Sequence, residues 1–64
     1  MKYVICTKPT SPFLTEGKTY VALISMYPAI TDYFIADDSM KQHWHPKYSF
    51  RDATEEEIKI FSEK

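Results

Sequence analysis

The single cysteine, Cys6, is the feature that most limits how a chain of 64 residues can fold. A domain of this size buries only about 60% of the surface that its unfolded chain exposes, so small folds often add disulfides, metals or partners. One cysteine rules out an intrachain disulfide and favours a reducing compartment. The chain must instead rely on large rings for its core, and it has one Trp, five Tyr and four Phe.

Short segments rich in β-branched and aromatic residues predict a mostly β fold. The segment 19–26 (TYVALISM) is apolar on both faces in its middle, which is typical of a central strand. Residues 46–48 are expected to form a single 3₁₀ turn. The chain has no repeat, linker or low-complexity segment, so we expect one domain, residues 1–64. The expected strands cover residues 2–6, 19–26, 33–37, 40–45 and 49–53.

The C-terminal segment, residues 54–63, changes to a helical pattern. Thr54 and Glu57 have the spacing of a capping box, in which each side chain accepts a hydrogen bond from the other residue's amide. The three glutamates 55–57 complement the helix dipole. We therefore interpret them as a solvated helix start rather than as an acidic contact for a basic partner.

The core should combine apolar residues of the strands with a narrow apolar stripe on the helix. At least one face of the Trp44 ring should also be buried. The other expected core residues are Val21, Leu23, Ile35, Phe50, Ile58 and Phe61.

The charge pattern argues against two classes of protein. The formal net charge is −1, and lysines alternate with carboxylates, whereas phosphate binding relies on clustered Lys and Arg. No apolar run approaches the ~20 residues of a membrane helix. The first ten residues, MKYVICTKPT, lack the pattern of a signal peptide. We expect a cytoplasmic protein that does not bind membranes and for which nucleic acid is an unlikely partner.

Residues 16 to 57 carry a recognisable order of segments: EGKTYVALISM, DYFIADDS, HWHPKYSF and an acidic TEEE helix start. This order resembles the small SH3-like barrel proteins encoded by many tailed bacteriophages. The resemblance implies a small SH3-like five-stranded barrel with a short C-terminal α-helix, located in the host bacterial cytoplasm. Members of that family are mostly uncharacterised, and some modulate host proteins. Ser39-Met40 stands where the family usually has a glycine in its Asp-Asp turn.

Two histidines, His43 and His45, lie two residues apart on an expected strand, so both rings should project from one face. Zinc needs three or four ligands, and Cys6, Asp37 or Asp38 could supply the rest. Nothing in the sequence brings these residues together. We therefore predict a solvated strand face, with no metal and no cofactor.

Cys6 paired with a histidine could form a nucleophilic dyad. A lone cysteine at the end of an apolar strand is more often a buried small hydrophobe. The sequence shows no third orienting group, and a barrel this small should lack a cleft of ~300 Å³. We therefore expect no catalytic residues and no enzyme activity.

Trp44, Pro46 and Tyr48 are the residue types that line the proline-binding groove of SH3 domains. Acidic residues that help such grooves are few here, so we favour a packing role over proline-motif binding. A broader protein-binding role fits better, because Tyr and Trp are enriched at interfaces. The expected surface joins the long loop 7–18 to residues 43–48. Its partner-binding residues are Phe13, His43, Trp44, His45, Pro46 and Tyr48.

The leading hypothesis is a protein-binding module, a monomer or small homo-oligomer that binds a host or phage protein. The alternative is a small barrel that binds nucleic acid or the ribosome. That alternative requires four or more basic residues to converge on one face. The candidates are Lys2, Lys8, Lys18, Lys41, Lys47 and Arg51.

Overall fold

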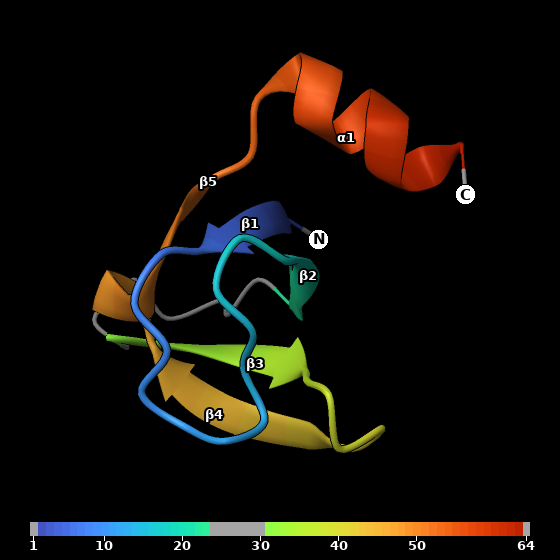
Figure 1. Cartoon of the computed structure of the whole chain (residues 1–64). Coiled ribbons are helices and arrows are strands. Elements are labelled where there is room, and N and C mark those ends of the chain that lie inside the picture. Colours follow the sequence, from blue (N-terminus) through green and yellow to red (C-terminus); the bar gives the residue numbers. More distant parts are fainter. Residues whose placement is uncertain (1, 24–30, 64) are drawn as a thin grey trace.

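Residues 2–23 and 31–63 are described by the computed structural model, in which five antiparallel strands form one curled half-barrel sheet (Figure 1). The strand order is β4-β3-β2-β1-β5, so the last strand returns to pair with the first. The expected mostly β fold class, with five antiparallel strands and a short C-terminal helix, is confirmed. The strands are β1 (Lys2–Cys6), β2 (Thr19–Leu23), β3 (Asp32–Ala36), β4 (Gln42–Pro46) and β5 (Phe50–Asp52).

All five expected strands are present; the first has its predicted bounds, and the last three are shifted by one or two residues at their ends. The third strand ends at Ala36 and the fourth begins at Gln42, because a tight turn occupies the residues between them. The expected 3₁₀ turn lies at η1 (Lys47–Ser49), one residue later than predicted. Residues 24–26 of the expected second strand lie outside the described residues.

The turn between β3 and β4 contains an unusual backbone conformation. Met40 has a φ of 69°, in the left-handed region that costs an L-residue roughly 1–2 kcal/mol. The chain's only glycine, Gly17, has a φ of 82°, so there the residue type matches the backbone.

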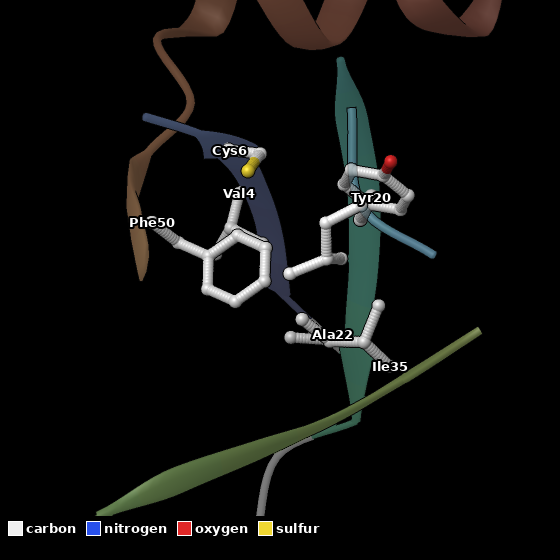
Figure 2. Packing of buried hydrophobic residues seen from close by; sticks show 7 residues of the cluster. Val4, Cys6, Tyr20, Ala22, Ile35 and Phe50 are labelled. Carbon is white, nitrogen blue, oxygen red and sulfur yellow. The ribbon is translucent and has the colours of Figure 1, made fainter. Parts of the chain in front are cut away.

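The core lies on one face of the sheet, which we call the inner face. Figure 2 shows the side chains of β1, β2, β3 and β5 converging there. The register that pairs Ala22 with Ile35 places both on this face. The buried cluster consists of Val4, Cys6, Leu14, Tyr20, Ala22, Ile35 and Phe50.

The predicted core is confirmed for Ile35 and Phe50 and wrong for Leu23, which is 39% exposed. Val21, Ile58 and Phe61 are only half-buried. The error on β2 is one of direction: Tyr20 and Ala22 face inward, so their neighbours Val21 and Leu23 face outward. Trp44 packs one side of its ring on Phe34, at 5.0 Å between centroids, and leaves 53% of the residue exposed.

Helix α1 (Glu55–Ser62) begins with the predicted capping box, since the Thr54 hydroxyl and the Glu57 carboxylate each accept a hydrogen bond from the other residue's amide. Arg51 of β5 donates two hydrogen bonds of 2.8 Å to Glu57. Phe61 meets the Tyr3 ring edge-on at 5.8 Å. These contacts place α1 beside β1, away from β3 and β4 (Figure 1). No described helix has the length and apolar character needed to cross a membrane.

Candidate functional site

The inner face ends in a buried carboxylate, Asp37, directly after β3. Asp37 follows Ile35 by two residues, so the alternation of the strand carries it to the same face. Its side chain is fully buried, and every hydrogen bond it accepts comes from the next turn and strand. A buried carboxylate is stable only when its oxygens are paired in this way.

The two oxygens of Asp37 have different partners. Oδ1 accepts hydrogen bonds from the Ser39 amide (3.0 Å) and hydroxyl. Oδ2 lies 2.7 Å from His43 Nδ1 and 2.8 Å from His45 Nε2. Burial alone would raise the pKa of Asp37, but the hydrogen bonds from Ser39, His45 and His43 outweigh it and hold that pKa well below its usual range.

The prediction that both histidines share one face is confirmed, because both reach the same carboxylate oxygen. The expected solvated face is wrong for His45, which is only 5% exposed and lies edge-on to Phe50. His43 is exposed and stacks on Phe13 at 5.7 Å with an interplanar angle of 14°. The three ligand atoms of Asp37, His43 and His45 lie within 4.8 Å of one another.

A second carboxylate, Asp38, ties the loop 7–18 to the turn after β3. It pairs with Lys18 and accepts hydrogen bonds from Thr15 (2.6 Å) and Tyr20 (3.1 Å). Lys18 holds the pKa of Asp38 below its usual range. The Asp38 amide also donates to the carbonyl of Phe13, at 2.9 Å. These bonds fix the Phe13 ring against His43.

The opposite, outer face of the sheet carries an apolar row. Leu23 lies opposite Phe34 across β2 and β3, and Phe34 lies opposite Trp44 across β3 and β4. Directly opposed residues share a face, so these three side chains form a row across three strands. Leu23 and Trp44 are exposed, and Phe34 is half-buried.

An open groove of about 430 Å³ lies between α1 and the outer side of β1 and β2. The expectation that so small a barrel has no room for such a hollow is therefore wrong. The short helix covers only part of the outer face and leaves the groove along its edge. The groove is lined by Ile5, Gly17, Lys18, Thr19, Glu57, Ile60 and Phe61.

The structure divides five of the six predicted partner-binding residues between two faces and places the sixth in η1. Phe13, His43 and His45 gather on the inner side around Asp37. Trp44 lies on the outer face, and Pro46 shares its direction on β4 because it is two residues further along. Tyr48 lies in η1 and is 68% exposed. The loop 7–18 contacts this part of the chain at two places: Phe13 stacks on His43, and the Thr7 and Lys8 amides donate to the carbonyl of Ser49, directly after Tyr48.

The sequence did not identify Leu23 and Phe34 as members of an exposed row. It offered Asp37 only as one of three possible additional zinc ligands, beside Cys6 and Asp38. The alternation in β4 was the available signal, because it already separates Trp44 from the two histidines. Cys6 is buried, and burial raises the pKa of its thiol, which disfavours the thiolate that a nucleophilic dyad needs.

Comparisons with protein-family models, curated proteins and solved structures find no match.

Proposed function

We propose that this chain is a protein-binding module that contacts its partner through the outer-face row of Leu23, Phe34 and Trp44. The supporting observation is the exposure of this row: Trp44 is 53% exposed, on the face opposite the main core cluster. Tryptophan is one of the residue types enriched among interface hot spots. The resemblance to phage barrels, by analogy, makes the partner a host or phage protein.

The row suits a protein partner because the sheet holds it rigidly. Cross-strand pairing sets the spacing of the three side chains, and the Phe34–Trp44 ring contact limits the freedom of the indole. Less side-chain entropy is therefore lost on binding than at a flexible surface. The partner should present apolar side chains, since the row offers little but apolar area.

The basic residues support a protein partner over nucleic acid. Lys2 pairs with Asp52, Lys18 with Asp38, and Arg51 with Glu57. Each pair cancels local positive charge that phosphate binding would need. Half of the six basic residues considered for nucleic-acid binding are thus neutralised by a neighbouring carboxylate. The buried Cys6 thiol likewise favours a binding role over nucleophilic catalysis.

Affinity capture from nuclease-treated bacterial lysate tests this proposal. The bait is the chain itself, compared with Trp44→Ser and with Ile60→Ser as the matched control, since Trp44 and Ile60 are large apolar residues of similar exposure. We expect one protein that the wild type and Ile60→Ser retain and that Trp44→Ser loses. Circular dichroism must first show that both variants are folded.

The isolated partner then permits a direct measurement. Trp44 is the only tryptophan, so its fluorescence reports on this surface alone. Binding through the row should shift the emission to shorter wavelength and protect the indole from acrylamide quenching. A partner that binds with unchanged Trp44 emission, or that Trp44→Ser retains, would overturn the proposal. Capture that disappears on nuclease treatment would favour the nucleic-acid alternative.

A further inference from the structure

The geometry points to a binding site for one divalent transition-metal ion, of which zinc is the best fit, formed by Asp37, His43 and His45. Two imidazoles and one carboxylate are the donor set of many zinc sites that keep an open coordination position. This site is on the inner side of the sheet, so it is independent of the outer-face surface proposed above. Its failure would leave that surface untouched.

The distances are close to those that a metal ion requires. Zinc bonds of ~2.0–2.1 Å in a tetrahedron place neighbouring donor atoms roughly 3.3 Å apart. Asp37 Oδ2 now lies 2.7 and 2.8 Å from the two imidazole nitrogens, and all three ligand atoms fall within 4.8 Å. To admit an ion, both oxygen–nitrogen separations must lengthen to roughly 3.3 Å, so Asp37 Oδ2 and the two rings move apart slightly on binding.

The surroundings hold the ligands in place. Ser39 donates two hydrogen bonds to Asp37 Oδ1, so that Oδ2 faces the histidines. Phe13 stacks on His43 and limits the rotation of its ring. Such supporting contacts fix the orientation of metal ligands and strengthen binding. Asp38 is engaged with Lys18 and takes no part in the site.

The ion replaces two hydrogen bonds and needs no redox step. In each imidazole, the proton on the nitrogen that faces Asp37 moves to the other nitrogen of the same ring. The nitrogen that faces Asp37 then offers its lone pair to the ion. Asp37 and His45 are buried, whereas His43 is exposed, so the ion enters past His43. The remaining coordination position is filled by water from that side.

Calorimetric titration of untagged, chelator-treated protein with Zn²⁺ at neutral pH tests the site. The chain has only two histidines, so an affinity tag must be absent. We expect one Zn²⁺ per chain and no binding of Mg²⁺, which prefers oxygen ligands. His43→Ala should weaken Zn²⁺ binding by at least ~100-fold, because losing even a supporting partner costs ~10–100-fold. Gln42→Ala, next to His43 but on the other face, is the matched control.

Nitrogen NMR of the imidazoles provides a second readout that needs no variant. Zinc should remove the proton signature from His43 Nδ1 and His45 Nε2 and shift both resonances, in slow or intermediate exchange. The site is overturned if Zn²⁺ does not bind stoichiometrically, if His43→Ala binds as tightly as Gln42→Ala, or if these nitrogens do not respond. If His43→Ala fails to fold, the NMR result decides.

Discussion

The inner and outer faces of the same sheet differ in how completely they are covered. On the inner face, Phe50 and the loop 7–18 close over the strands, and within residues 2–23 and 31–63 every buried side-chain nitrogen or oxygen has a hydrogen-bond partner. On the outer face, α1 lies beside β1 and leaves the row across β2, β3 and β4 exposed. One short helix cannot cover a five-stranded sheet, so an open apolar surface follows from the small size of the chain.

Strand β4 contains both environments within three residues. His43 and His45 face the buried carboxylate, and Trp44 between them faces outward. In a sheet that is covered on one side, successive residues of a strand face the core and the solvent in turn. Neighbouring residues can therefore have different roles. The inner face therefore serves stability, and the two proposed sites lie on opposite faces of the sheet, with the metal site inside and the protein-binding row outside.

The largest expected effect is a difference in the free energy of unfolding lost when two aromatic residues on opposite faces are replaced by alanine. Phe50→Ala should lower the free energy of unfolding by ~3–5 kcal/mol, because it removes a ring from the core. Trp44→Ala should cost only about 1–2 kcal/mol, since its ring is half exposed and loses mainly the contact with Phe34. Urea unfolding measures both. Equal losses would show that the outer face is not open.

The next effect tests which face of β2 is buried, by substituting two adjacent residues. Ala22→Leu should destabilise the fold by ~1–3 kcal/mol, because Ala22 is fully buried and extra methylenes in a packed core force side chains off their rotamers. Leu23→Thr should change the free energy of unfolding by about 1 kcal/mol or less, since Leu23 is partly exposed. The reverse order in thermal melts would mean that Leu23, not Ala22, faces the core.

A smaller effect concerns the turn that sets which residues of β4 face inward. Met40→Gly should raise the free energy of unfolding by about 0.5–1 kcal/mol, because glycine relieves the positive φ but adds freedom to the unfolded chain. Gly17→Ala is the converse control and should cost ~1 kcal/mol, since a Cβ meets no atom there and only the φ of 82° opposes it. Chemical denaturation resolves both. Destabilisation by Met40→Gly would contradict the turn geometry.

The smallest effect is a pH dependence of the helix attachment on the outer side. The hydrogen bonds from Arg51 lower the pKa of Glu57 to about 2 in the folded protein, below its value in the unfolded chain. The folded state therefore gains stability from Glu57 above about pH 4.5, and this gain is lost as the pH falls toward 2. The difference in melting temperature between the wild type and Glu57→Gln should shrink over that range. A constant difference would contradict the ion pair.

The amino-acid sequence by itself determined the local features of this protein. Alternation and β-branched residues predicted the strands within one or two residues at the ends that the structure describes. The capping box and the shared face of His43 and His45 were also predictable. Each depends on residues within a few positions of one another, where backbone geometry alone sets the outcome.

Only the tertiary structure decided which face of each strand became the core. The segment 19–26 is apolar on both faces, so its alternation is compatible with either direction, and the register with β3 and β1 selected Tyr20 and Ala22. The same selection turned Trp44 outward and brought Asp37 against both histidines. A period of two defines two faces but does not say which one is buried, because burial depends on the elements that pack against the sheet.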